Sequence, residues 1–384
     1  MRSRIAYSKD KNKSTYSPKK SLYVDKSAME VHFLLKKETK EENLPALLGA
    51  DRSFSLFCST QIEDSLLSTI IRMKHLIHLL SLYFLFLLCS CSTSEKEYYL
   101  FTSFHEPADA GLRYLYSEDG IHWDSIAGTW LKPELGTNIM RDPSIWRDKD
   151  GTFHLVWTIA WKKDRGFGYA HSKDLINWSE EKRIPVMDHI PETYNVWAPE
   201  LFYDDVKNQY MIIWSSLVPD STSIGFSEEN KDYYRLYYVT TRNFNTFSEA
   251  KLLYDPGFSC IDGYLLKRAP DNYVMVIKDN RKPNHSNLKI TFSKNAEGPF
   301  IPASDSFTEE WSEGPCVTKV GNDYMIYYDL YRQKIYGATK TRDFVHFTNM
   351  TDSIQIPEHH KHGTICKVPE SIIEHLKEIH KQVN

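Results

Sequence analysis

Three acidic residues open the first strand of a repeated unit in this chain: Asp142, Asp262 and Glu313. Carboxylates brought together from separate units raise one another's pKa, so at least one of them keeps its proton near neutral pH. A carboxylic acid facing a carboxylate is the pair that hydrolyses glycosidic bonds. The alternative is structural, because Asp-Pro and Asp-Gly pairs such as those at Asp142 and Asp262 often cap turns before strands.

The strand openings recur five times along the chain. They are Asp142–Trp146, Ala198–Phe202, Asp262–Leu266, Glu313–Val317 and His362–Cys366. If each is an innermost strand along a central channel, we expect its first residue to reach the mouth of that channel. The second opening begins with Ala198, and alternation along a strand predicts that Glu200 points to the same face.

The elements that must position these residues are short strands in repeated order. Aromatic-rich strands are expected at Tyr98–Phe104, Phe153–Thr158, Tyr210–Ser215, Tyr273–Ile277 and Tyr324–Tyr328. Each is followed by a polar turn closed by a bulky aromatic residue, and these turns start at residues 117, 172, 241, 293 and 341. About four strands per unit, repeated five times, predict an all-β, five-bladed β-propeller. An eight-stranded sandwich would not repeat five times. Since the last opening follows residue 347, we expect one blade to share both chain ends.

The composition excludes several classes of function. Lys and Arg number 47 against 51 Asp and Glu, a formal net charge of −4, so no basic excess favours nucleic-acid binding. Apolar residues make up 41% and aromatic residues 14% of the chain, which is enough for a sizeable core. Six Cys residues in 384 do not form a disulfide scaffold.

The residues before the repeats read as a targeting segment. Met73-Lys74-His75 precedes the apolar run Leu76–Leu88, a pattern typical of a bacterial secretion signal and too short for a spanning helix. Leu88–Cys91 resembles a lipobox, in which Cys91 would carry the lipid; a plain signal peptide is the alternative. The prediction is a cell-envelope lipoprotein, in the periplasm or on the cell surface, that meets the membrane only through its lipid.

Three segments follow from this interpretation. Residues 1–72 are expected to be a mis-assigned or disordered extension, with a genuine N-terminal tail as the alternative. Residues 73–91 would be the lipoprotein signal, and 92–384 the propeller. The sequence indicates no oligomeric state.

Four blocks of the chain resemble the signatures of glycoside hydrolase family 43, over about residues 98–370. They are Arg141-Asp142-Pro143, Trp197-Ala198-Pro199-Glu200, Ile261-Asp262-Gly263 and Glu313-Gly314-Pro315. The resemblance implies a five-bladed propeller that acts on plant cell-wall glycans as an arabinofuranosidase, endo-arabinanase or β-xylosidase, with inversion. It also implies that Asp142 is the general base and Glu313 the general acid, whose pKa and orientation Asp262 tunes. Many members have Asp in place of Glu200 and Pro in place of Gly263, so the identity of the substrate stays open.

The predicted function is an exo-acting, inverting hydrolase of arabinose- or xylose-containing oligo- or polysaccharides. A family 32-like fructosidase shares the Arg-Asp-Pro triplet, but no Trp-x-Asn-Asp-Pro block supplies its nucleophile. A non-catalytic, glycan-binding surface propeller is the other alternative, and three converging acids argue against it.

Further residues could bind the substrate or an ion. Arg141 could donate to a sugar hydroxyl or form a structural ion pair. The aromatic residues Trp161, Trp197, Trp311 and Tyr331 could offer flat surfaces to a sugar ring. The resemblance implies no required cofactor but a possible calcium ion in the channel. His362 could lie beside that ion or be a buried core histidine, since calcium prefers oxygen ligands.

Overall fold

The computed structural model describes residues 67–79, 81, 95–219 and 232–383. The chain divides into two units, Met1–Ser92 and Thr93–Asn384. In the first unit a helix covers residues 67–79 and therefore includes the start of the expected signal, whereas Cys91 lies outside the described residues. Within the described ranges, no helix is long and apolar enough to cross a membrane.

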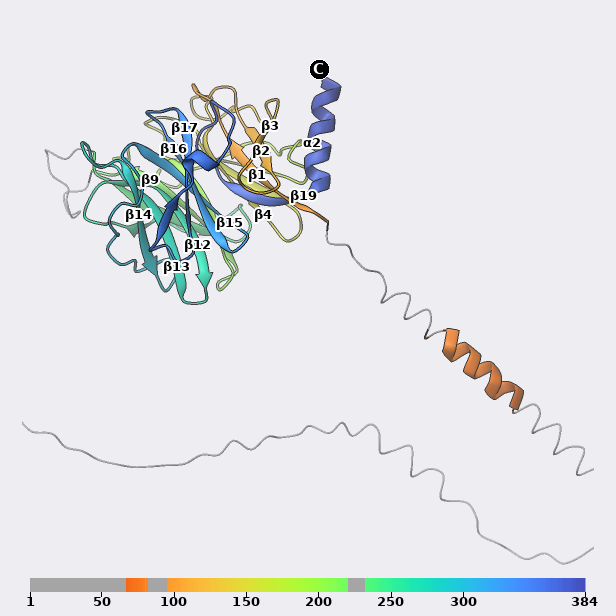
Figure 1. Cartoon of the computed structure of the whole chain (residues 1–384). Helices are drawn as coiled ribbons and strands as arrows, with labels where there is room; N and C mark the ends of the chain where they lie inside the picture. The colour runs from red at the N-terminus through yellow and green to blue at the C-terminus, as the bar shows by residue number, and fades with distance from the viewer. Residues whose placement is uncertain (1–66, 80, 82–94, 220–231, 384) are drawn as a thin grey trace, which may run out of the picture. The chain divides into compact units, whose positions relative to one another are not determined.

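Five antiparallel sheets make up the second unit (Figure 1). The first contains, in spatial order, β19 (Ile365–Pro369), β1 (Glu97–Ser103), β2 (Arg113–Ser117) and β3 (Asp124–Ile126). The second contains β4 (Arg141–Arg147), β5 (Phe153–Thr158), β6 (Phe167–Ser172) and β7 (Lys182–Ile184). The third contains β8 (Trp197–Asp204), β9 (Gln209–Leu217), β10 (Tyr234–Thr241) and β11 (Lys251–Tyr254).

The fourth sheet contains β12 (Cys260–Ala269), β13 (Asn272–Asp279) and β14 (Asn287–Ser293). The fifth contains β15 (Ser312–Val320), β16 (Asp323–Leu330), β17 (Ile335–Thr341) and β18 (Phe347–Asn349). The short 3-10 helix η2 (Thr351–Ser353) follows β18, and the helix α2 (Glu370–Val383), which the repeats did not predict, follows β19.

The innermost strands close into a ring. β4, β8, β12 and β15 contact one another in this order, and β19 contacts both β15 and β4. Because β19 pairs with β1, the chain's last strand completes the blade that its first strands began. The predicted five-bladed β-propeller, with one blade sharing both chain ends, is therefore confirmed.

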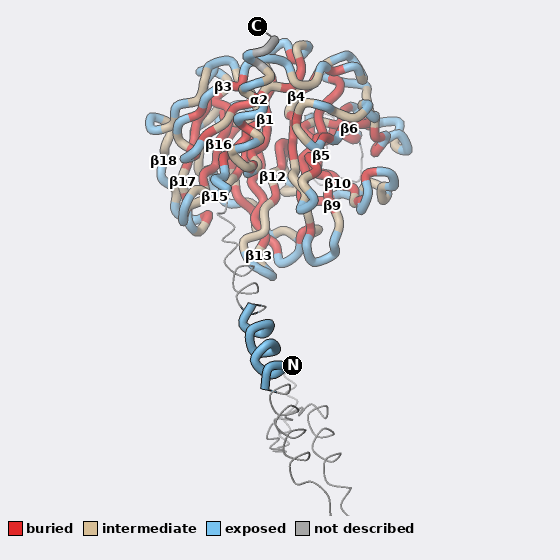
Figure 2. Tube along the Cα trace, turned by 90° about the vertical axis from the view of Figure 1, so that its right-hand side faces the viewer, coloured by how far each residue is buried: buried red, intermediate tan, exposed pale blue. Residues whose placement is uncertain are grey.

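Hydrophobic side chains hold neighbouring blades together. The second strand of a blade lies between two neighbours, so its side chains alternate between two clusters. In β5, Leu155 and Trp157 pack toward the first blade, whereas Val156 packs toward the third. All six residues of β5 are buried, and the buried parts of the chain concentrate inside the sheets (Figure 2). This packing makes the blades a rigid support for the residues at the channel.

Four innermost strands carry the same irregularity near their start. On β4, Arg141 pairs with Thr158 but Ser144 pairs with Val156, so two residues between these pairs lie opposite a single residue of the partner strand. β8, β12 and β15 break register in the same way. In each strand, the residue directly after the last pair before this break has a left-handed backbone. The φ angles are 52° at Asp142, 47° at Ala198, 53° at Asp262 and 59° at Gly314. These are β-bulges, and each adds one residue to its strand.

The bulges show which residues of the strand openings are structurally equivalent, and this differs from the sequence alignment of the openings in one blade. Glu313 pairs with Asp329 and so matches Arg141, which pairs with Thr158. Gly314, and not Glu313, occupies the left-handed position of Asp142. The alignment based on strand openings was wrong by one residue in this blade, because the bulge and not the first acidic residue marks equivalent positions.

Gly314 offers a test of this geometry. A Cβ at Gly314 would lie 2.5 Å from the ring of His362, whereas at Gly321, with the same φ of 59°, it would meet nothing within 4 Å. Both alanine substitutions carry the left-handed cost of about 1–2 kcal/mol. We expect Gly314→Ala to lose roughly 1–3 kcal/mol more free energy of unfolding than Gly321→Ala, because it alone overpacks its surroundings. Urea denaturation followed by circular dichroism measures the difference, and equal losses would contradict the described contact.

Candidate active site

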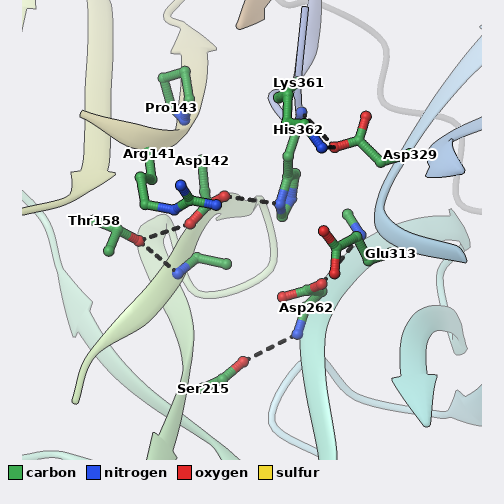
Figure 3. A network of polar contacts seen from close by, with 12 residues as sticks. Arg141, Asp142, Pro143, Thr158, Ser215, Asp262, Glu313, Asp329, Lys361 and His362 are labelled. Carbon is green, nitrogen blue, oxygen red and sulfur yellow. Dashed lines mark hydrogen bonds and ion pairs between the residues drawn. The ribbon is translucent and has the colours of Figure 1, made fainter. Parts of the chain in front are cut away.

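The predicted carboxylates meet in one pocket at a channel mouth. Its volume is about 300 Å³, and Asp142, Asp262, Glu313 and His362 are among its lining residues. They come from the starts of β4, β12 and β15 and from the segment before β19. Figure 3 shows Asp142 and His362 facing each other, with Asp262 and Glu313 side by side across the site. The structure thus brings together the four residues that the repeats placed around one axis.

Asp142 is held as a carboxylate. Its Oδ1 lies 3.0 Å from Nδ1 of His362, and its Oδ2 accepts a hydrogen bond of 2.9 Å from Thr158. Burial raises the pKa of Asp142, but the charges of His362 and Arg141 and the two hydrogen bonds outweigh it and hold the pKa below its ordinary value. An ionised carboxylate inside a pocket can accept a proton from water, as a general base must.

His362 is the cation of this pair. Burial lowers its pKa, but Asp142 and the further negative charges of Asp262 and Asp329 raise it to about 9. The backbone N–H of His362 donates to Oδ2 of Asp329 at 3.2 Å, which fixes the segment. Burial raises the pKa of Asp329 to about 7, although the charge of Lys361 opposes the rise.

The possible calcium ion beside His362 stays a prediction. Nδ1 of His362 lies 3.0 Å from Oδ1 of Asp142, so the described contact of this imidazole is an ion pair. Within the described part of the chain, no group of three or more His, Cys, Asp or Glu side chains could hold a metal ion. The described residues therefore support the ion pair with Asp142 as the role of His362.

Glu313 has a cation of its own. Nζ of Lys278 lies 2.7 Å from Oε2 of Glu313, and only 3% of the lysine side chain is exposed. The same ammonium lies 4.8 Å from the centre of the Tyr331 ring. Glu313 itself keeps 27% of its side chain exposed, so its carboxyl group remains accessible from the pocket.

Lys278 and Asp329 were missed by the sequence reasoning, although a signal for both exists. Four of the second strands have an aromatic residue at their first or second position, and the residue five positions after it pairs with the last residue before the bulge. These residues are Thr158, Ser215, Lys278 and Asp329, which follow Phe153, Tyr210, Tyr273 and Tyr324. A polar residue at this constant spacing therefore marks a position at the channel mouth.

Asp262 lies beside Glu313 (Figure 3). Its backbone N–H donates to Oγ of Ser215 at 3.0 Å, and its Oδ2 accepts from the N–H of Gly314 at 3.1 Å. Burial raises the pKa of Asp262; the charges of His362 and Lys278 oppose this rise, and those of Glu313 and Asp142 add to it. The pKa values of Asp142 and Asp262 are therefore shifted in opposite directions.

Aromatic side chains form one wall of the pocket. Trp161 is 57% exposed and lies 5.2 Å from Trp197, whose ring stacks on Tyr234 at 5.1 Å. Trp161, Trp197 and Tyr331 line the pocket as predicted, but Trp311 does not. The ring of Trp311 packs edge-on against Tyr331 at 5.9 Å, so it supports the wall from behind.

Arg141 lies where it could contact a substrate, and it also forms an ion pair within the protein. It lines the pocket, and its Nη1 also donates to both carboxylate oxygens of Glu106, at 2.8 and 2.9 Å. Its guanidinium lies 4.3 Å from the centre of the Trp161 ring, an arrangement typical of a cation–π contact. Arg141 therefore holds the aromatic wall in place.

Glu200 is not at this mouth, contrary to the prediction. The bulge on β8 sets Trp197 opposite Ser215 and Glu200 opposite Ile213, so one extra residue reverses the alternation after Ala198. Glu200 is buried and lines a different cavity. The period-2 argument failed because it assumed a regular strand.

Other lining residues come from loops between second and third strands. They are Asp232 and Tyr234, at the start of β10, and Asn280 and Lys282, which follow β13. The lengths of these loops differ between blades, so comparison of the repeats does not locate these residues.

Comparisons with known proteins match most of the part of the chain that forms the sheets. A family model described as "Probable glycosyl hydrolase domain", related to glycoside hydrolase family 43, matches residues 95–374. An α-L-arabinofuranosidase of Bifidobacterium longum is 26% identical over 157 residues, which cover 36% of this chain. The chain spans only 15% of the length of that relative.

The solved structures that match part of this chain include two arabinofuranosidases. The Lactobacillus brevis enzyme is 17% identical over 55% of this chain and 72% of its own, with a TM-score of 0.41. The Clostridium thermocellum enzyme is 12% identical over 60% of this chain and 78% of its own, with a TM-score of 0.44. An exo-β-1,3-galactanase of Phanerochaete chrysosporium is 10% identical over 57% of this chain and 52% of its own, with a TM-score of 0.44.

The ion pair between His362 and Asp142 predicts a pH dependence of stability. The pKa of His362 rises from 6.5 to about 9 in the folded protein, so its contribution is complete below pH 6.5 and disappears as the pH rises through 9. We expect the free energy of unfolding of the parent protein, relative to His362→Gln, to fall by up to roughly 3 kcal/mol between pH 6 and pH 9.5.

Urea denaturation at the two pH values measures this difference. His346→Gln is the matched control, because His346 pairs with Asp343 on the surface with 87% of its side chain exposed. A pH dependence that is the same in the parent, His362→Gln and His346→Gln would contradict the assigned ion pair.

Proposed function

Because the chain belongs to the glycosyl hydrolase family related to family 43, we propose that it hydrolyses glycosidic bonds, with Asp142 as general base and Glu313 as general acid. The observation that carries this proposal is the pairing of each carboxyl group with its own buried cation in one pocket. His362 faces Asp142 and Lys278 faces Glu313, so the two groups are held apart in separate electrostatic surroundings.

The proposed reaction is a single displacement. Asp142 removes a proton from a water molecule while the water oxygen forms a bond to the anomeric carbon. At the same time the glycosidic C–O bond breaks, and Glu313 gives its proton to the leaving oxygen. The products are a sugar of inverted configuration and an alcohol; Asp142 ends protonated and Glu313 ionised, and exchange with solvent restores both.

The neighbours of Glu313 support its role as acid. Lys278, at 2.7 Å, stabilises the carboxylate that Glu313 becomes when it gives up its proton. Asp262 acts in the opposite direction, because its negative charge opposes ionisation of a neighbouring acid. The hydrogen bond from Gly314 to Asp262 fixes that carboxyl group next to Glu313. We assign Asp262 to the tuning and orientation of the acid.

We propose arabinose- or xylose-containing glycans as the substrate class, with release of a terminal sugar. The pocket of about 300 Å³ lies at the small end of ligand sites, and Trp161, Trp197 and Tyr331 offer flat surfaces to one sugar ring. The name of the Bifidobacterium longum relative, an α-L-arabinofuranosidase, supports arabinose as the first sugar to test.

Kinetics with two kinds of leaving group test the roles. Asp142→Asn should slow hydrolysis of every substrate by at least about 10³-fold, because no other group would activate the water. Glu313→Ala should slow hydrolysis of arabino-oligosaccharides by roughly 10²–10⁴-fold but of a 2,4-dinitrophenyl glycoside by less than about tenfold, since that leaving group hardly needs a proton. Initial rates on arabinofuranosides, xylosides and galactosides measure both effects.

The exposed residue Asp305 supplies the control, and Asp305→Asn should leave all rates unchanged. Equal slowing of both leaving groups in Glu313→Ala would show that Glu313 is not the acid. Full activity in both Asp142→Asn and Glu313→Ala would show that this site does not carry out the reaction. Proton NMR identifies the anomer that forms first. Its configuration should be inverted relative to that of the substrate, and a retained configuration would overturn the single displacement.

We further propose that the protein is an exported lipoprotein anchored through Cys91. The support is the sequence pattern from Met73 to Cys91, a positive start, an apolar run and a lipobox-like end. Expression from Met73 should yield a lipidated protein in the membrane fraction, and Cys91→Ser should release it or leave it unprocessed. Cell fractionation and metabolic labelling with a fatty acid measure this; a cytoplasmic protein that retains residues 1–72 would contradict it.

A further inference from the structure

A second and larger cavity lies farther along the same innermost strands. Its volume is about 530 Å³, and its lining consists of Asp205 and four segments: Ile145–Arg147, Glu200–Tyr203, Tyr264–Lys267 and Thr364–Lys367. On β4, Asp142 lines the active-site pocket whereas Arg147, five residues later, lines this cavity. Five residues of a strand span about 16 Å, so the cavity lies toward the opposite end of the channel.

Arg147 lines this cavity without a partner. Within the described part of the chain, no acceptor forms a hydrogen bond or ion pair with its side chain, and its Nε is buried and unsatisfied. The charge of Glu95 acts on it only at longer range, and the ring of Phe153 lies 5.7 Å away. A buried donor without an acceptor is unfavourable, so a ligand with an acceptor would be stabilised here. The planar fork of a guanidinium matches a carboxylate in particular.

Glu200 contributes no repelling charge. Burial raises its pKa to about 8, although the hydrogen bond from Ser144 and the charge of His362 oppose the rise. The side chain is therefore mostly protonated at neutral pH and can donate a hydrogen bond to a ligand. Asp205, the other acidic residue of the lining, is paired with Lys267, so a negatively charged ligand can lie close to Glu200 without facing an unpaired carboxylate.

An aromatic pair supplies the apolar part of the cavity. The rings of Trp146 and Tyr203 lie 5.9 Å apart at an angle of 31°, and both residues are half-buried and line the cavity. At the edge, Lys267 pairs with Asp205, and Lys367 lies 3.3 Å from Glu97. Ring surface beside a free guanidinium suits a sugar ring that carries a carboxylate.

We propose that the channel end opposite the active site binds a uronic acid, with its carboxylate on Arg147, its ring against Trp146 and Tyr203, and a hydroxyl on Glu200. A neutral sugar would leave Arg147 unpaired, and a small organic acid would leave the aromatic pair unused. The site is separate from the hydrolytic pocket and does not depend on the proposed reaction. It would hold an acidic glycan while the other end of the channel acts on a neutral one.

Titration calorimetry with the full chain tests the site, using D-glucuronate, D-galacturonate, D-xylose and acetate as probes. We expect at least one uronate to bind at least tenfold more tightly than xylose and acetate. Arg147→Gln should weaken that binding at least tenfold and leave the rate of hydrolysis unchanged. Asp142→Asn is the matched control at the other mouth and should change uronate affinity less than twofold.

Each other outcome overturns the proposal. If xylose binds as tightly as the uronate, the carboxylate is not recognised. If acetate binds as tightly as the uronate, the sugar ring is not recognised. Loss of binding in Asp142→Asn but not in Arg147→Gln would place the uronate in the hydrolytic pocket. If Arg147→Gln fails to fold, Arg147→Lys keeps the charge without the planar fork and should still weaken uronate binding.

Discussion

The backbone turns left-handed at Asp142, Ala198, Asp262 and Gly314, and the polar architecture around the channel depends on these four bulges. At three of them, Ala198, Asp262 and Gly314, the backbone N–H forms a hydrogen bond outside its own sheet. Ala198 donates that hydrogen bond to Thr158 at 2.8 Å and Asp262 donates to Ser215 at 3.0 Å, in each case a hydroxyl of the preceding blade. Since a buried N–H needs an acceptor, the bulges link the blades as well as bending the strands.

The charges at the active-site mouth are balanced locally and not as one cluster. The carboxylate of Asp142 faces the imidazolium of His362, and Glu313 faces the ammonium of Lys278. Asp262 has no ion pair among the described contacts of the site, and its pKa is raised where that of Asp142 is lowered. The repeated strand openings supply similar acidic residues. Residues of the neighbouring blades then shift the pKa values of Asp142 and Asp262 in opposite directions.

The same strands serve two ends of the channel. After the bulge on β8, the side-chain alternation is reversed, and Glu200 turns away from Asp142 into the larger cavity. Strand β4 carries Asp142 near its start and, at its end, Arg147, which has no hydrogen-bond or ion-pair partner among the described residues. One innermost strand thus presents the carboxylate of Asp142 to one opening and the guanidinium of Arg147 to the other. The two openings can therefore bind ligands of different charge.

The sequence by itself determined the number of blades, the closure through both chain ends and the three acids of the mouth. These follow from short-range patterns: aromatic strands, polar turns and strand openings repeat at similar spacing, and each unit folds by the same rules. The tertiary structure alone decided the offset of Glu313, the direction of Glu200 and the pairing of His362 with Asp142. A bulge adds one residue that no hydrophobic alternation reveals, and partners such as Lys278 and Glu313 come from different blades. Their contact depends on the closure of the ring, which no local stretch of sequence contains.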